Sequence, residues 1–474
     1  MGRWPEHAPT ARDLESFADA DRGSFWHATA TIEPRPALEG PERAGLAIVG
    51  GGFSGLWAAL AAKEREPGRE VVLLEAGVAG EAASGRNGGF YSASLTHGLA
   101  NGWRRFSDEM PALERLGHEN VAGIISDLDR YGIDCDLETV GTLAVAIEPH
   151  EVDVLAAAIE PMRELGHEVE WLDTPDRVQR QLRSPTYLAG LWHKSGEGVL
   201  DPGKLVAGLR RAALDAGVTI FESTRVESLE RSGPGVVLRT GRGRLEADRV
   251  LLATGAHPSP VRRARRYIVP VYDYVLISEP LSDAQLDDIG WTNRQGVSDV
   301  GNQFHYYRRV GANRILWGGY DAVYRYGGPI APELDDHEPT FARLAQNFFH
   351  TFPQLEDLRF SHRWGGAIDT CSRFSAFFGK ALGGRAVYVT GHTGLGVAAS
   401  RFGARTALDL LDRRETEATS LRYVRTKPMA FPPEPLRSGV VQLTRNRLAA
   451  ADRNNGRRGM WLRLLDRLGL GFDS

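Results

Sequence analysis

The sequence predicts an α/β protein in which a doubly wound parallel sheet is joined to an α+β unit that carries a mixed sheet. Its 474 residues exceed what one ordinary core holds, so two or three domain-sized units are expected. Near residue 50, a short apolar run, a glycine-rich turn and a helical stretch lead into a second apolar run. Further strand-like runs alternate with helical stretches along the chain, an order that is typical of α/β folds.

The composition is that of a globular protein, with 42% hydrophobic and 25% charged residues. A formal net charge of -4 on a body of this size favours neither a nucleic-acid partner nor a membrane surface. Cys135 and Cys371 are too far apart to build a disulfide framework or a CxxC metal site, so no metal is expected. The N-terminus has no apolar signal segment, which makes a cytoplasmic location the expectation. The oligomeric state stays open.

The longest apolar stretch, residues 45–62, is interpreted as a buried strand, a turn and a helix rather than a membrane span, because it contains four glycines. Its glycines fit G-x-G-x-x-G. Gly50 permits a tight turn, Gly52 lets the backbone approach a pyrophosphate, and Gly55 lets helix and strand pack closely. Phe53 and Ser54 begin the helix, whose free N–H groups suit phosphates.

The next predicted strand, residues 69–75, ends in an acid. Glu75 lies 20 residues beyond Gly55 (75 − 55), where a carboxylate can hold both ribose hydroxyls of an adenosine, and Ala76 follows it. Strand, glycine turn, helix and acid together predict a dinucleotide site. They do not distinguish NAD from FAD.

A second glycine-rich segment, Ala-Ala-Ser-Gly-Arg-Asn-Gly-Gly at residues 82–89, favours FAD. A nicotinamide enzyme needs no such loop after its second strand, whereas an isoalloxazine ring must lie against backbone. This segment resembles the D-amino-acid-oxidase superfamily of FAD-dependent oxidoreductases, and most of all its gamma-glutamylputrescine oxidase branch, as does Ser-Phe-Trp at 24–26. The resemblance assigns flavin contacts to Ser84, Gly85, Arg86, Asn87, Gly88 and Gly89.

The resemblance extends over nearly the whole chain. Residues 248–256 are similar to the second FAD motif of the family, and residues 391–396 to a turn before a helix whose N-terminus faces the flavin N1–C2=O edge. The residue at 226 is implied to meet the adenine through its backbone. The cofactor residues implied in these later segments are Val226, Ala253, Thr254, Gly255, Gly391, His392, Thr393, Gly394, Leu395 and Gly396.

The order of the motifs implies a discontinuous organisation. The expected parts are an N-terminal extension (1–43), an FAD-binding domain (44–100, 196–262 and 360–415), a substrate domain (101–195 and 263–359) and a C-terminal tail (416–474). The tail is arginine-rich and carries Trp461, Leu464, Leu465 and Leu468 at helical spacing. Docking of this amphipathic helix onto the chain's own body is favoured over contact with a membrane or a partner.

The function that the resemblance implies is FAD-dependent oxidation of a small amine or amino acid to an imine, by hydride transfer to flavin N5. An oxidase that produces hydrogen peroxide is favoured. In residues 303–309 the period of two places His305 and Tyr307 on one face and Tyr306 and Arg308 on the other. Arg308 is expected to bind a substrate carboxylate, with a structural ion pair as the equal alternative.

Two further residues are candidates for the catalytic site. Tyr274 is expected to close the pocket unless it belongs to the core, and His305 takes the place of Arg308 if the substrate carries no negative charge. At residues 371–373, Cys-Ser-Arg replaces the Thr-Pro-Asp that is usual in the family, which puts the usual substrate contacts in doubt. FAD is expected to be non-covalent, because Cys371 lies several residues from the place where some relatives attach it.

Two alternatives remain open. The same fold serves dehydrogenases that pass electrons to a quinone or a carrier protein. An RNA-acting flavoprotein is the second alternative, supported by Arg262–Arg266 and the arginine-rich tail and opposed by the net charge, so no nucleic-acid partner is expected.

Overall fold

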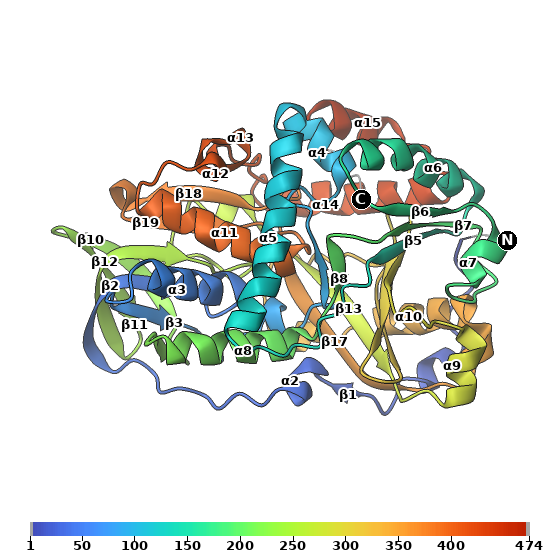
Figure 1. Ribbon diagram of the computed structural model, residues 1–474, viewed down its shortest axis with the longest axis horizontal. Helices are drawn as coiled ribbons and strands as arrows, with labels where there is room; N and C mark the ends of the chain where they lie inside the picture. Colours follow the sequence, from blue (N-terminus) through green and yellow to red (C-terminus); the bar gives the residue numbers. More distant parts are fainter. Residues whose placement is uncertain (1–2, 471–474) are drawn as a thin grey trace.

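The computed structural model describes residues 3–470, and within them most strands fall into two large sheets (Figure 1). The first contains a row of parallel strands, here called the parallel sheet. Its strands are, in spatial order, β9 (Thr219–Phe221), β3 (Val71–Leu74), β2 (Gly40–Val49), β12 (Gly243–Leu252) and β19 (Ala386–Thr390). The order of β2 and β3 around the glycine turn is the α/β arrangement that the sequence predicts.

Helices cover one face of the parallel sheet (Figure 1). They are α3 (Phe53–Arg65), α8 (Pro202–Asp215) and α11 (Gly396–Leu411), with α5 (Met110–Arg130) packed across α11. The other face packs against the hairpin β10 (Val226–Ser232) and β11 (Gly235–Thr240), and β18 (Phe377–Ala381) pairs with β19. Asp201 caps α8 by accepting a hydrogen bond of 2.9 Å from Lys204 N.

The second sheet, here called the mixed sheet, contains parallel and antiparallel pairs. Its strands are, in spatial order, β1 (Asp21–Arg22), β17 (Phe360–Thr370), β13 (Val269–Ser278), β16 (Arg314–Gly319), β15 (His305–Val310), β14 (Gly296–Asp299), β5 (Thr142–Ala146), β7 (Ala189–His193) and β6 (Val169–Leu172). Helix α10 (Glu338–Thr351) packs on one face through an apolar cluster that includes Phe341 and Leu276. The opposite face is turned toward the glycine-rich loops. A short ribbon of β4 (Phe90–Ser92) and β8 (Glu197–Val199) lies beside the two sheets.

One expected boundary differs from the structure. Residues 360–370 were assigned to the FAD-binding domain, but they form β17 of the mixed sheet. The reason is the antiparallel register with β13, which runs from Val269 opposite Thr370 to Ser278 opposite Phe360. The chain therefore enters the parallel sheet only after β17, through a turn that leads to β18.

The remaining helices lie around these sheets. They are α1 (Ala11–Glu15), α2 (Trp26–Thr29), α4 (Leu99–Phe106), α6 (Pro149–Glu164), α7 (Pro175–Gln179), α9 (Asp283–Ile289), α12 (Glu417–Ser420), α13 (Arg422–Arg425), α14 (Leu436–Asp452) and α15 (Met460–Arg467). Among residues 3–470, no helix is both long and apolar enough to cross a membrane.

The C-terminal tail docks onto the chain's own body. Asp452 accepts hydrogen bonds from the backbone amides of Asn302 and Gln303, next to the mixed sheet. In α15, Leu462 and Leu465 are buried. Leu464 and Leu468, which were expected on the docked face, are 48% and 55% exposed. The buried face of α15 is therefore rotated about the helix axis relative to the expected one.

Candidate active site

The glycine turn between β2 and α3 is shaped by close backbone contacts. Gly50 has a φ of +109°, and a Cβ on it would clash with the carbonyl oxygen of Ala253 at the end of β12. A Cβ on Gly55 would clash with the carbonyl oxygen of Gly50. Any side chain at either position would push α3 away from the strands, which explains why both residues are glycine.

Gly52, which precedes α3, faces the second glycine-rich loop. A Cβ on Gly52 would lie 2.8 Å from Ser84 Oγ, and that hydroxyl accepts a hydrogen bond of 2.9 Å from Phe53 N. The first turn of α3, which includes Ser54, contains no acidic side chain. The positive end of the helix dipole is therefore available to an anion beside Ser84.

Glu75 stands at the carboxyl end of β3, half-buried beside this turn. Its carboxylate accepts hydrogen bonds from Gly51 N (2.6 Å) and Gly77 N (2.9 Å), which fix its position. Its carbonyl oxygen accepts a bond of 2.7 Å from Thr224 N, so the segment before Val226 runs next to it. A carboxylate has about four acceptor sites, and those left over suit the hydroxyls of a ribose. The neighbouring Ala76 is exposed.

The loop at residues 84–89 is held by side chains from distant segments. Ser24 Oγ donates to Gly85 O, Trp26 Nε1 to Asn87 O, and Trp364 Nε1 to Arg86 O, each at 2.8 Å. Asn87 closes the loop internally, since its Oδ1 accepts from the amide of Gly89 and its Nδ2 donates to the carbonyl of Ser84. Such a loop presents fixed backbone to a ligand.

Gly88, in the same loop, lies against the mixed sheet. A Cβ on Gly88 would lie 2.6 Å from the ring of Tyr306. Glycine at this position lets the loop and the mixed sheet approach closely.

A cavity of about 210 Å³ lies at the carboxyl ends of β12 and β19. Its walls include Thr254, Gly255, His257 and Thr390 from the parallel sheet, and Pro270 at the start of β13. A Cβ on Gly255 would meet no atom within 4 Å. Ligands of open α/β sheets bind outside the carboxyl ends of the strands, which is where this cavity lies.

The turn at residues 391–396 is organised by Asp369, a residue that the sequence did not single out. The Asp369 carboxylate accepts hydrogen bonds from Gly391 N (2.6 Å) and Thr393 N (3.3 Å) and lies 3.5 Å from His392 Nδ1. Burial raises the pKa of Asp369, but the bonds from His392 and from the turn amides outweigh burial, so its pKa lies below the usual value. The turn sets the direction of α11, whose first residue is Gly396 and whose N-cap is Leu395. A Cβ on Gly394 would meet Ile368 Cδ1 at 4.0 Å.

These features together fit FAD. A helix end suited to an anion, a carboxylate with acceptor sites suited to ribose hydroxyls, a cavity at the strand ends and two glycine-rich loops are the features that a bound dinucleotide needs. The thiol of Cys371, within hydrogen-bond distance of Ser375 O and Gly391 O, is fully buried, which agrees with non-covalent binding.

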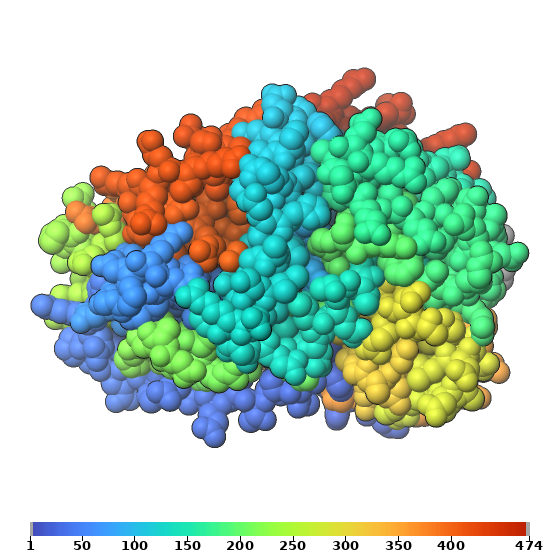
Figure 2. Space-filling view, in the orientation of Figure 1, coloured from blue at the N-terminus to red at the C-terminus, as the bar shows by residue number. Residues whose placement is uncertain are grey.

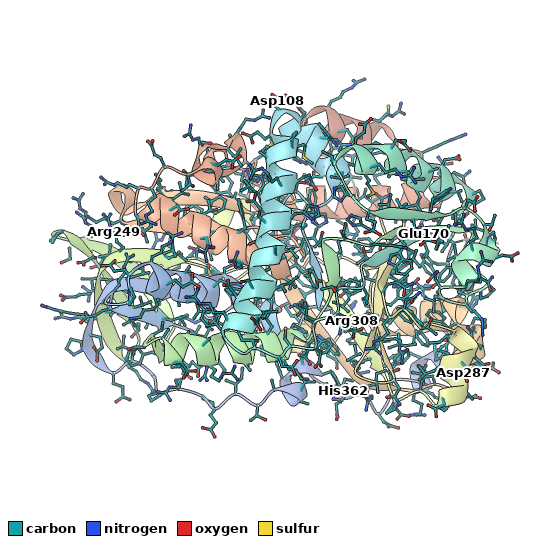
Figure 3. All side chains as sticks on the ribbon, in the orientation of Figure 1. Asp108, Glu170, Arg249, Asp287, Arg308 and His362 are labelled. Carbon is teal, nitrogen blue, oxygen red and sulfur yellow. The ribbon has the colours of Figure 1, made fainter. Side chains whose placement is uncertain are left out.

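Arg308, which was expected to bind a substrate carboxylate, has backbone partners in the structure. It is 2% exposed and lies in the interior of the molecule (Figure 3). Its Nη1 donates to Gly89 O (3.0 Å) and Leu200 O (2.6 Å), and its guanidinium stacks over the ring of Trp26 at 5.6 Å. These bonds engage Nη1, and Nε donates to Arg309 O at 3.2 Å. Arg308 therefore anchors the loop at residues 84–89, here called the flavin loop after the contacts that the resemblance implies, and the carboxylate clamp stays a prediction.

His305 and Tyr274 also lie away from the glycine loops. His305 is fully buried between the rings of Trp317 and Tyr320, and burial lowers its pKa to about 3. Tyr274 is fully buried against α10, and its hydroxyl donates to Leu334 O at 2.8 Å. Both side chains belong to the α10 face of the mixed sheet, so the structure contradicts their assignment to the catalytic site.

The polar pair on the other face is Tyr306 and Asp273. Tyr306 Oη donates to Asp273 Oδ2 at 2.5 Å, and both side chains are half-buried next to the flavin loop. Burial raises the pKa of Asp273 to about 6, although the bond from Tyr306 opposes the shift. The strand alternation did place Tyr306 on the Arg308 face, but it gave no sign that Asp273 on β13 would meet it.

Comparison with known proteins identifies the family of the chain. A family described as FAD dependent oxidoreductase matches residues 46–410. Gamma-glutamylputrescine oxidoreductase of Escherichia coli K12 is 30% identical over 375 residues, which are 77% of this chain and 83% of that protein. Glycine oxidase of Geobacillus kaustophilus is 25% identical over 380 residues, 78% of this chain and 93% of its own.

Glycine oxidase is also similar to this chain in its three-dimensional structure. The crystal structure of glycine oxidase from Geobacillus kaustophilus superposes with a TM-score of 0.64 at 22% identity, over 82% of this chain and all of that one. The α/β fold and the superfamily resemblance expected from the sequence are thereby confirmed.

The first testable prediction concerns Gly52. Gly52→Val should abolish FAD retention, because the new side chain would meet Ser84 and hold the pyrophosphate off the backbone. Gly68→Val is the matched control, since a Cβ there meets nothing within 4 Å. The ratio of flavin to protein after gel filtration measures the effect. Equal FAD content in the two variants would place the pyrophosphate elsewhere.

Glu75 provides the second prediction. Glu75→Ala should weaken FAD binding by roughly 1.5–3 kcal/mol per lost charge-assisted bond, about 10- to 150-fold in Kd. Titration of the FAD-free protein with FAD, followed by flavin fluorescence, gives the Kd. Glu70→Ala, an exposed acid next to β3, should leave the Kd unchanged. An unaltered Kd for Glu75→Ala would exclude ribose binding by this carboxylate.

Proposed function

Because the chain belongs to the family of FAD-dependent oxidoreductases, we propose that it oxidises a small amine or amino acid at a carbon–nitrogen bond and that oxygen accepts the electrons. Two relatives support this substrate class, since their names specify a polyamine derivative and glycine. Bound FAD supplies a two-electron acceptor for the bond next to nitrogen. The substrate loses two electrons and two protons to give an imine, water hydrolyses the imine, and oxygen is reduced to hydrogen peroxide.

The observation that carries the proposal is the Tyr306–Asp273 pair beside the flavin loop. With a pKa of about 6, Asp273 is mostly ionised at pH 7 and presents a negative charge on this face. An alkylammonium group, whose pKa resembles that of lysine at roughly 10.4, needs such a partner to be bound. The bond from Tyr306 fixes the direction of the carboxylate. The pair therefore suits binding and orientation of a cationic amine rather than a clamp on an anion.

The test of the reaction is flavin reduction by a panel of amines. Under anaerobic conditions, an amine or amino acid that is a substrate should bleach the flavin absorbance of the purified protein. Admission of air should restore the colour with one hydrogen peroxide for each substrate oxidised. Bleaching that air does not reverse, but a quinone does, would replace the oxidase with a dehydrogenase. No bleaching by any amine would overturn the proposed substrate class.

The third prediction follows from the pKa of Asp273. Since the ionised form binds the ammonium group, kcat/KM should fall about tenfold per pH unit below about pH 6, and this fall should disappear in Asp273→Asn. At neutral pH, Asp273→Asn should lower kcat/KM by roughly 30-fold or more, equivalent to about 2 kcal/mol for a lost buried ion pair.

Two variants control the Asp273 experiment. Asp283→Asn removes an exposed acid on α9 and should leave the pH profile unchanged. Tyr306→Phe should keep the fall of kcat/KM below about pH 6. It should lower kcat/KM less than Asp273→Asn does, because the negative charge of Asp273 remains. If Asp273→Asn still showed the fall of kcat/KM below about pH 6, that fall would belong to another titrating group.

A further inference from the structure

A cluster of three histidines and two glutamates lies away from the flavin loop, where α5 meets the edge of the mixed sheet. Glu114 and His118 are one turn apart on α5. His167 precedes β6, His193 ends β7, and Glu197 begins β8. In Figure 2 the cyan surface of α5 borders the green surface of the segment that contains these strands. The mechanism proposed above uses none of these residues.

Four members of the cluster form a chain of close contacts. Glu197 Oε1 lies 3.1 Å from His193 Nδ1, and His193 Nε2 lies 2.7 Å from His167 Nδ1. His167 Nε2 lies 3.1 Å from Glu114 Oε2, but the two atoms are not aligned for a hydrogen bond. His167 Nε2 is therefore a buried nitrogen without a hydrogen-bond partner among the described residues.

One arrangement of the protons along this chain leaves a lone pair on His167. When Glu197 is ionised, His193 can donate from Nδ1 to it, and His167 can donate from Nδ1 to His193 Nε2. In that arrangement both histidines are neutral and His167 Nε2 carries a lone pair facing the Glu114 carboxylate. Two facing acceptors repel unless a cation lies between them.

His118 completes the group from its place one turn along α5. Its ring lies 5.4 Å from that of His167, and the ligand atoms of Glu114, His118 and His167 all lie within 4.8 Å of one another. Gly196 makes room for the ring, because a Cβ there would lie 2.6 Å from His118 Cε1. Ion ligation at about 2.1 Å would draw the three atoms to about 3.4 Å apart, which needs only small side-chain rotations.

We propose that Glu114, His118 and His167 bind a divalent first-row transition-metal ion, with Zn²⁺ as the probe of choice. Two imidazoles and one carboxylate form a known zinc ligand set, and imidazole disfavours Mg²⁺ and Ca²⁺. His193 and Glu197 orient His167 from behind, as the outer partners of metal-bound histidines do. Glu114 and His167 are at most 8% exposed, so the ion would be largely enclosed.

The site would connect the helices that cover the parallel sheet to the edge of the mixed sheet. Helix α5 packs on α11 of the parallel sheet, and His167 belongs to the mixed sheet's edge. Glu197 begins the strand that leads to Leu200, whose carbonyl oxygen accepts a bond from Arg308. A bound ion would therefore stabilise this seam rather than take part in catalysis.

The experiment uses tag-free protein with its FAD, treated with a chelator, loaded with Zn²⁺ and passed through gel filtration. The wild type and Glu119→Gln should retain about one zinc per chain, and His167→Gln and Glu114→Gln less than about one tenth of that. Glu119 is the matched control, since it is an exposed acid on the same helix. Zn²⁺ should raise the Tm of the wild type and the control but not of the two ligand variants.

Flavin absorbance separates loss of the ion from loss of the fold, because all four proteins should remain yellow. If a ligand variant does not fold, the zinc content of His118→Gln is compared with that of the wild type instead. The proposed site predicts about one zinc per chain in the wild type and much less in His118→Gln. A wild type that retains no more zinc than His167→Gln, or whose Tm does not change with Zn²⁺, would overturn the site. The contacts would then be an ion pair between protonated His167 and Glu114.

Discussion

The joint between the two sheets depends on one buried cation. Arg308 extends from the mixed sheet and donates from one nitrogen to two carbonyl oxygens, those of Gly89 and Leu200. Burial lowers its pKa to about 10, so the guanidinium remains charged at neutral pH. Backbone dipoles and the ring of Trp26 offset part of the cost of burying the charge. Removal of the guanidinium would take away the bond to Leu200 O, whereas Gly89 O would keep its bond from Leu200 N.

The position of the flavin loop follows from this joint. Gly89 has a φ of +75°, and a Cβ on it would lie 2.5 Å from Arg308 Nη1, so glycine is required for the guanidinium to reach the carbonyl oxygen. Trp26 contributes twice, because its ring lies under the guanidinium and its Nε1 donates to the loop at Asn87. The N-terminal segment, the strand and the loop therefore hold one another in place, which would present a rigid surface to a flavin bound as the resemblance implies.

The parts of the protein that are local in sequence were predictable. The glycine turn, Glu75, the strand at 269–278 and the cap at Asp201 each depend on residues close together in the chain, and the structure places them as local chemistry requires. The alternation of side chains in β15 also correctly separated Tyr306 and Arg308 from His305. Alternation cannot say which face meets the cofactor, and for this reason His305 and Tyr274 were assigned to the wrong side. Asp369 and Asp273 were missed because the side chains that they meet, Thr390 and Tyr306, lie 21 and 33 residues away.

The same limit explains why no metal was expected. Metal sites are recognised in sequence by close spacing of ligands, and of the three proposed ligands only Glu114 and His118 have such a spacing. His167 and His193 come from other elements, and only the fold brings them to α5.

Comparison of the two titratable clusters also separates their roles. Asp273 and Tyr306 are half-buried beside the flavin loop, where a substrate needs access, whereas Glu114 and His167 are enclosed at a seam. Accessibility therefore favours the substrate binding proposed for the first cluster and the structural role proposed for the second.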